Sequence, residues 1–383
     1  MYINHKDIED LALGATVLGA GGGGDPYITR LLAQKIIQKF GPVQLLQPFM
    51  VPDEALIIPT AFMGATTVLQ EKLLNGKEAY GALKMLENYL RSKAFATMPA
   101  EAGGLNAIIP FMVAARAGIP VIDSDGMGRA LPEHQMSSFH IYGISGSPMA
   151  INTEKDDYIL LKVKDNYRLA EIARSLLAST GGIGNMAGYV MTGEQMKETA
   201  ITGTVSFGLK LGTAIRKAIQ EKGDTFEAIS QVTSNSTYGR AIKLFQGKIT
   251  DIERRLNNSY LRGREVIRGI KDFSGSECII EFQNENIIAL VDNETAALVP
   301  DIITYLDAET GFPLSIEQLK YGYRVTVIGI PTPEIMRTES ALQVWGPRKF
   351  GYDIDYIPLE VLEKFRAIQR ANKGFLEKGG AQG

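Results

Sequence analysis

The sequence has little cysteine and histidine, which limits the chemistry open to it. The single cysteine, Cys278, among 383 residues excludes an internal disulfide and a zinc site built from cysteines. The three histidines, His5, His134 and His140, lack the i, i+4 spacing of a helical zinc pair. His134 and His140 flank an acidic segment, where either could act as a base or ligand. A partly buried polar histidine is the alternative for each.

Long apolar runs and an excess of one charge are also missing. No stretch of about 18 apolar residues is present, so we expect no transmembrane helix and no membrane partner. The opening residues, MYINHKDIEDLALG, lack the basic and apolar regions of a signal peptide. A net charge of −3 without a basic stripe argues against nucleic acid as a partner. We therefore expect a cytoplasmic protein.

The N-terminal part alternates between helical and strand patterns. Helices are predicted at 4–18, 26–40, 77–93 and 105–117, and strands at 43–46, 56–60, 94–98 and 119–122. Asp25 followed by Pro26 is a typical helix start, with an Asp cap and Pro in the first turn. Such alternation with short connections predicts an α/β fold with a mostly parallel sheet covered by helices.

The C-terminal part changes character after a helix predicted at 205–221. Strands are predicted at 240–250, 264–271, 277–283, 286–291, 297–304 and 322–329. Short strands separated by turn signals indicate a β-rich sandwich or barrel module. We place the boundary between an α/β domain at 1–165 and a β-rich domain at 166–383.

A run of glycines follows the first predicted helix. Gly19, Gly21 and Gly24 match the G-x-G-x-x-G pattern, but a helical segment precedes them and the later acidic residue of a dinucleotide site is missing. Two interpretations remain open. The loop Gly21, Gly22, Gly23, Gly24 and Asp25 either faces a ligand with its backbone N–H groups or is a closely packed turn between helices.

The strand predicted at 119–122 ends in an acidic loop. Asp123, Asp125, Arg129 and Glu133 follow it, and ligand sites of open α/β sheets lie at the carboxyl ends of strands. An Asp-Gly turn with a helix cap is the alternative.

Glu101 follows the neighbouring predicted strand in the same way. Asn106 lies just beyond it, in the first turn of the next helix. If the two strands are adjacent, Glu101, Asp123 and Asp125 open on one edge of the sheet. Several carboxylates in one crevice need shared protons or a cation, which allows acid–base catalysis or a divalent metal held by oxygen ligands.

Five segments together resemble the S-methyl thiohydantoin desulfurase-like family, a hydantoinase-associated bacterial family formerly described as a domain of unknown function. The segments are LGAGGGGDP (18–26), AEAGGLNA (100–107), IDSDGMGRALPE (122–133), GNMAGYVMTG (184–193) and VWGPRKFGYD (344–353). The resemblance covers nearly the whole chain. It implies an N-terminal three-layer α/β domain and a C-terminal barrel-like domain.

The resemblance also implies a hydrolase of a small five-membered cyclic amide or amidine, acting at the ring carbon between two nitrogens. On this basis Asp123 or Asp125 activates water, and Glu101 or Glu133 supplies a proton or an ion contact. The glycine loop with Asp25 would bind the ring's amide groups or a carboxylate, and we count Asn106 and Arg129 among the substrate-binding candidates. Zinc or manganese would have Asp123, Asp125 and His134 as first candidate ligands.

Two other functions compete with this hypothesis. The glycine loop Gly19–Gly24 could serve a dinucleotide-dependent oxidoreductase. The chain could also be a non-catalytic subunit or binding protein of a hydantoinase-type system. In each case we expect a homo-oligomer, because the β-rich module offers a surface for assembly.

Overall fold

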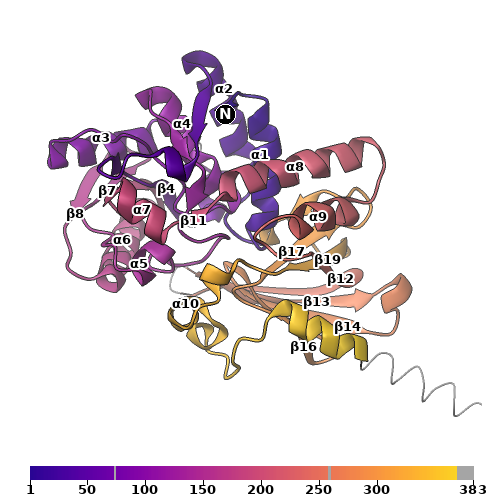
Figure 1. Cartoon of the computed structure of the whole chain (residues 1–383). Coiled ribbons are helices and arrows are strands. Elements are labelled where there is room, and N and C mark those ends of the chain that lie inside the picture. The colour runs from indigo at the N-terminus through magenta and orange to yellow at the C-terminus, as the bar shows by residue number, and fades with distance from the viewer. Residues whose placement is uncertain (73–74, 258–259, 369–383) are drawn as a thin grey trace, which may run out of the picture.

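The computed structural model describes residues 1–72, 75–257 and 260–368. In Figure 1 the N-terminal part, indigo to magenta, forms helices around small sheets, and the C-terminal part, orange to yellow, contains a large sheet. Two long helices join these parts, α1 (Asp7–Leu18) and α8 (Thr204–Gln220). Their apolar side chains share one core with β17 (Ile302–Asp307) and β19 (Arg324–Ile330). The two parts are therefore packed together through helices.

Helices α1 and α8 approach each other at glycines. A Cβ at Gly14 would lie 1.8 Å from the Gly208 carbonyl oxygen, and one at Gly212 would lie 1.6 Å from the Asp10 carbonyl oxygen. Only glycine allows this separation of the two backbones. The carboxylate of Asp10 also binds Arg216 of α8, with Nε 2.6 Å from Oδ1.

The predicted N-terminal helices are present with small shifts of their ends. They are α1, α2 (Tyr27–Phe40), α3 (Glu78–Leu90) and α4 (Ile109–Ala117). The predicted start of α2 is shifted by one residue: Pro26 stands at the N-cap and Tyr27 is the first helical residue. Asp25 is therefore not the N-cap, although its Oδ1 accepts a hydrogen bond from the Tyr27 N–H at 2.9 Å. Gly118, with φ of 71°, ends α4 in the left-handed conformation that glycine adopts without strain.

The mostly parallel N-terminal sheet is not confirmed. The larger sheet of this part is antiparallel, in the order β4 (Thr60–Gly64), β9 (Ile183–Ala187), β7 (Met149–Thr153) and β8 (Tyr158–Leu161). Parallel pairing joins β2 (Val43–Leu46) to β5 (Val121–Ile122), and single bridges continue it through Thr97 and Ala96. Strand β9 comes from the glycine-rich segment at 181–188, where sequence patterns predicted no strand. It is the antiparallel partner of both β4 and β7.

Strand β9 also returns the chain to the N-terminal part after residue 165. Helix α6 (Asn166–Thr180) precedes it, and α7 (Gly193–Thr199), α8 and α9 (Thr225–Ser234) follow. The placement of the domain boundary at residue 165 stays a prediction.

The C-terminal part is an eight-stranded antiparallel sheet that does not close into a barrel among the described residues. Its order is β16 (Glu294–Leu298), β15 (Glu285–Val291), β14 (Glu277–Gln283), β13 (Tyr260–Gly269), β12 (Ile242–Asn257), β19, β17 and β18 (Pro313–Leu314). The expected barrel is therefore an open sheet. The strand predicted at 297–304 is two strands, because Pro300 interrupts it and cannot donate a ladder hydrogen bond.

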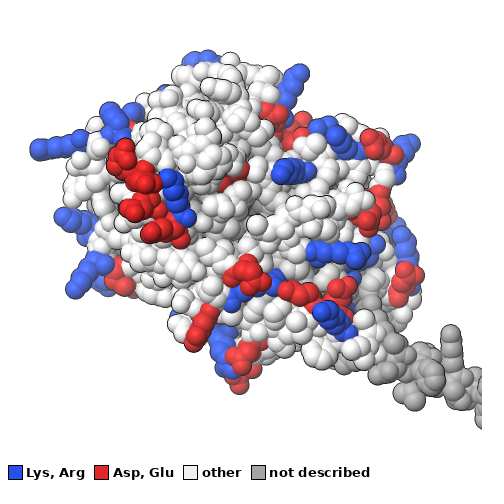
Figure 2. All heavy atoms as spheres, viewed as in Figure 1, with Lys and Arg blue, Asp and Glu red and all other residues white. Residues whose placement is uncertain are grey.

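Short elements complete the chain. They are β1 (Tyr2–Ile3), β3 (Leu56–Ile57), β6 (Ser124–Asp125), α5 (Ser138–Ile141), β10 (Met191–Thr192), β11 (Ile201–Thr202), α10 (Glu339–Trp345) and a helical segment at 359–368. None of the described helices is long and apolar enough to cross a membrane. On the face shown in Figure 2, acidic and basic side chains are interspersed.

Candidate functional site

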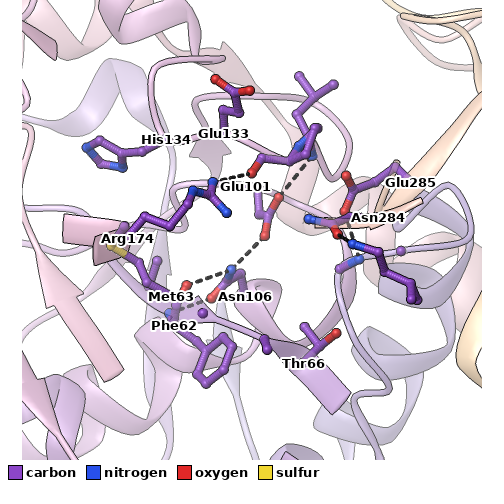
Figure 3. Close-up of a pocket in the computed structure, with 18 of the residues that line it drawn as sticks. Phe62, Met63, Thr66, Glu101, Asn106, Glu133, His134, Arg174, Asn284 and Glu285 are labelled. Carbon is purple, nitrogen blue, oxygen red and sulfur yellow. Dashed lines mark hydrogen bonds between the residues drawn. The ribbon is translucent and has the colours of Figure 1, made fainter. Parts of the chain in front are cut away.

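A cavity of about 350 Å³ lies where the N-terminal part, helix α6 and the C-terminal sheet meet. Its polar wall includes Glu101 and Glu133 from the N-terminal loops, Arg174 from α6, and Glu285 from β15 (Figure 3). Phe62, Met63, Leu131, Leu177 and Met186 are among its apolar lining. A small apolar cavity with a few convergent polar groups is the usual form of a ligand site.

Glu101 is held firmly in this cavity. Its Oε1 accepts a hydrogen bond from Asn106 Nδ2 at 2.6 Å, and its Oε2 accepts one from the Leu131 N–H at 3.2 Å. Asn106 is itself fixed, because its Oδ1 accepts the Phe62 N–H at 2.6 Å (Figure 3). Burial raises the pKa of Glu101 to about 7, against these hydrogen bonds. The carboxyl can therefore hold or release a proton near neutral pH.

Glu285 places a second buried carboxyl at the same cavity from the opposite part of the molecule. Its Oε1 accepts the Gly23 N–H at 3.2 Å, and its Oε2 is buried without a hydrogen-bond partner among the described residues. Burial and the charge on Glu101 raise the pKa of Glu285. The sequence patterns did not single out Glu285. The signal that could have found it is the polar run Gln283–Asn286 inside an otherwise apolar pair of strands.

Three further cavity residues, Thr66, Glu317 and Arg174, were also missed. The Thr66 hydroxyl donates a hydrogen bond to Glu317, and burial raises the pKa of Glu317. The Arg174 guanidinium lies 3.9 Å from the centre of the Tyr260 ring and donates to the Pro132 carbonyl at 3.2 Å. None of the three stands in a sequence pattern that indicates a site.

The structure places Asp123 and Asp125 outside the cavity lining. Asp123 accepts hydrogen bonds from Gln47 Nε2 at 3.0 Å and from the Ser206 N–H at 2.8 Å. Asp125 Oδ2 accepts three backbone N–H groups, those of Ala102 at 2.7 Å, Met127 at 3.0 Å and Gly128 at 2.8 Å. Burial nevertheless raises the pKa of Asp125 to about 7. Asp125 therefore fixes the loop that follows Glu101, whereas Asp123 connects the residue after β2 to the first turn of α8.

The other residues of the acidic loop divide between the cavity and the interior. Glu133 lines the cavity, and Figure 3 shows its carboxylate turned away from Glu101, where it accepts a hydrogen bond from Gln135. Arg129 does not line the cavity and is fully buried. It donates to the backbone carbonyls of Asn286 and Asp301, so it joins the two parts of the molecule.

The glycine loop is partly a wall of the cavity and partly a packed turn. Gly21, Gly22 and Gly23 line the cavity, but a Cβ at Gly23 would lie 3.0 Å from Gly104, and one at Gly21 would lie 2.4 Å from Asn286. The Gly22 N–H donates to Gly19 and the Gly23 N–H to Glu285, so neither is free for an anion.

The rest of the glycine segment lies away from the cavity. Gly24 and Asp25 do not line it, and the Asp25 carboxylate accepts hydrogen bonds from Gln318 Nε2 and from the Tyr27 N–H. The loop follows helix α1, so the strand that a dinucleotide fingerprint requires before its glycines is not there.

The expected metal ligands do not fit a divalent ion. Among the residues that the structure describes, no three His, Cys, Asp or Glu side chains are grouped to hold a metal. His134 lines the cavity and stacks on Tyr189 with ring centroids 4.5 Å apart, and burial lowers its pKa to about 3. Asp123 and Asp125 bind protein N–H groups instead. No metal step is therefore derived from these residues.

Comparison with known proteins gives two family matches that together span most of the chain. A model described as "S-Me-THD-like, N-terminal domain" matches residues 6–163, and "S-Me-THD-like, C-terminal domain" matches residues 164–359. A search of curated proteins found no match. A crystal structure of a protein from Chromobacterium violaceum aligns with a TM-score of 0.79 and 22% identity, covering 94% of this chain and 100% of that one. At this identity the likeness concerns the fold alone.

Proposed function

Because this chain belongs to the S-methyl thiohydantoin desulfurase-like (S-Me-THD-like) family, we propose that it hydrolyses the carbon–sulfur bond of a small five-membered ring of the S-methyl thiohydantoin type. The observation that carries the proposal is the pair of buried carboxyls, Glu101 and Glu285, at one cavity. They come from opposite parts of the chain. The proposal moves the catalytic role from Asp123 and Asp125 to this pair.

Hydrolysis of such a ring needs a base and an acid on one small substrate. One carboxylate takes a proton from water, whose oxygen bonds to the ring carbon between the two nitrogens. A proton passes to the ring nitrogen, the carbon–sulfur bond then breaks, and the sulfur leaves as methanethiol after accepting a proton. The water oxygen becomes the ring carbonyl. The products are therefore the hydantoin and the thiol, and no oxidant or reductant is needed.

The environment of the pair supports this division of roles. Two interacting carboxyls in a buried site do not both ionise readily, so one retains a proton while the other is ionised. Asn106 and the Leu131 N–H fix Glu101, and the Gly23 N–H fixes Glu285. Phe62 and Leu131 are among the apolar residues that line the same cavity, which suits a flat ring and limits water.

The test is turnover of S-methyl thiohydantoin by the purified chain, measured as methanethiol with a thiol reagent and as hydantoin by chromatography. We expect Glu101→Gln and Glu285→Gln each to lower kcat by about 100-fold or more, the usual contribution of a general acid or base. Glu265→Gln is the matched control. Glu265 is equally buried and its pKa is also raised to about 7, but it lies outside the cavity.

Two results would contradict the proposal. Full turnover in both Glu101→Gln and Glu285→Gln would show that the two carboxyls do not take part in the reaction. No turnover in the parent, across hydantoin, S-methyl thiohydantoin and related amidines, would favour a non-catalytic subunit or binding protein.

A further inference from the structure

Arg129 is a buried cation whose hydrogen bonds all go to backbone carbonyls. Nε donates to Ala130 at 3.0 Å, Nη1 to Pro300 at 3.2 Å and to Asp301 at 2.8 Å, and Nη2 to Asn286 at 3.0 Å. Its side chain is fully buried, and no described carboxylate accepts a hydrogen bond from it. A buried charge needs a compensating charge nearby. The structure therefore has to place an anion within reach of Arg129 without direct contact.

The residues next to these contacts carry the cavity carboxyls. Asn286, which accepts from Arg129, directly follows Glu285 in β15, and Ala130, which also accepts from it, directly precedes Leu131, whose N–H binds Glu101. One guanidinium thus connects the two segments that hold the pair. Asp301, also near Arg129, already has a partner of its own in Arg337, at 3.0 Å.

We infer that Arg129 is a positioning residue that supplies a buried positive charge against which Glu101 and Glu285 share one proton. One cation offsets one anion, so one carboxyl stays ionised as the base and the other stays protonated as the acid. The inference rests on the proposed role of the pair. Other titratable groups around the pair are Asp125, Glu133, His134, Arg174, Asp301 and Glu317.

The protonation of the pair can be counted without any substrate. In protein labelled with ¹³C-glutamate, infrared difference spectra at about pH 7 separate protonated carboxyls from carboxylates. We expect Glu101→Gln and Glu285→Gln each to lose one protonated carboxyl, because the remaining partner ionises beside Arg129. The double variant should lose no more than either single variant.

Two outcomes would overturn the inference. Loss of two protonated carboxyls in the double variant would mean that both are neutral and Arg129 has no anion in the pair. Loss of none would mean that both are ionised. Glu265→Gln is the control: with a pKa of about 7, Glu265 is about half protonated at this pH. That partial signal should disappear in addition to any other loss, because Glu265 lies outside the cavity.

Replacement of Arg129 gives a second readout. Arg129→Met should add one protonated carboxyl to the spectrum and move the acidic limb of the pH–rate profile up by about one pH unit or more, because the base loses its counter-charge. Arg129→Lys keeps the charge and should restore the parent spectrum. A merely structural role would lower stability in both variants and leave the spectrum and the limb unmoved. If Arg129→Met does not fold, the spectra of Glu101→Gln, Glu285→Gln and the double variant still test whether the pair shares one proton.

The two proposals can fail separately. The spectra require no turnover, so the shared proton can be observed in a protein that does not hydrolyse the carbon–sulfur bond of the substrate. A protein whose turnover depends on both carboxyls, but whose spectra show two neutral or two ionised groups, would support the proposed hydrolase function and contradict the proposed role of Arg129.

Discussion

The carboxyl pair at the cavity and the two aspartates of the acidic loop are neighbours with different surroundings. Asp125 and Glu101 are both buried, and the charge on Asp125 contributes to the raised pKa of Glu101. Asp125 Oδ2 accepts three backbone N–H groups and Glu285 Oε1 accepts one, and the second oxygen of each carboxyl is buried without a partner among the described residues. The difference is that Glu285 lines the cavity and Asp125 does not. Burial and a shifted pKa alone therefore do not identify a catalytic carboxyl; access to the cavity separates the two groups.

The largest expected effect concerns the stability of the acidic loop. Asp125→Ala leaves the N–H groups of Ala102, Met127 and Gly128 without their acceptor. Each unsatisfied buried donor costs about 1–3 kcal/mol, so we expect a loss of roughly 3 kcal/mol or more in the free energy of unfolding, measured with urea. Asp125→Asn retains an acceptor oxygen and should lose less.

The opposite result for Asp125→Ala would contradict this comparison between the cavity carboxyls and the aspartates of the acidic loop. An Asp125→Ala protein as stable as the parent, but without turnover, would return Asp125 to the chemistry and make the acidic loop the site.

An intermediate effect is expected in the pH dependence of stability. Burial raises the pKa of Glu265 from 4.5 to about 7. Between these values the folded chain keeps a proton that the unfolded chain releases, so the free energy of unfolding falls as pH rises from about 4.5 to about 7 and levels off above it. The raised pKa values of Glu101 and Asp125 also make the free energy of unfolding fall as pH rises. Glu265→Gln should make the slope shallower in urea titrations across this range.

This measurement sharpens the comparison because Glu265 belongs to neither group. If Glu265→Gln leaves the slope unchanged, Glu265 is not protonated in the folded state, and it no longer serves as a buried control that differs from Glu101 only in its distance from the cavity.

The smallest effect is expected at Asp123. In Asp123→Asn the side-chain oxygen still accepts the Ser206 N–H, and Gln47 can turn its own amide oxygen toward the new NH₂ group. We expect turnover within about twofold of the parent, because Asp123 lies outside the cavity lining and its hydrogen bonds can be retained. A large loss of kcat, with unfolding unchanged, would show that Asp123 acts in the reaction.

Sequence patterns located half of the candidate site. The predicted meeting of Glu101 with the aspartates was conditional on adjacency of the segments at 94–98 and 119–122. The parallel bridge between Thr97 and Val121 shows that these segments are adjacent, although 94–98 forms isolated bridges and not a strand. That adjacency brings the Glu101 loop to Asp125. The direction in which each carboxyl faces was not predictable, because it depends on which oxygen finds backbone N–H groups in the folded loops.

The sequence by itself determined most local structure and the family. The helix periodicity of α1, α2, α3 and α8 and the alternation in β12 to β15 are local properties, set by which face each segment buries. The tertiary structure decided the sheet directions, since β9 inserts between β4 and β7, and it opened the expected barrel. It also decided the site: Glu285 meets Glu101 only because Arg129 and the glycine loop bring distant segments together, and contacts so far apart in the chain leave no periodic signal in either segment.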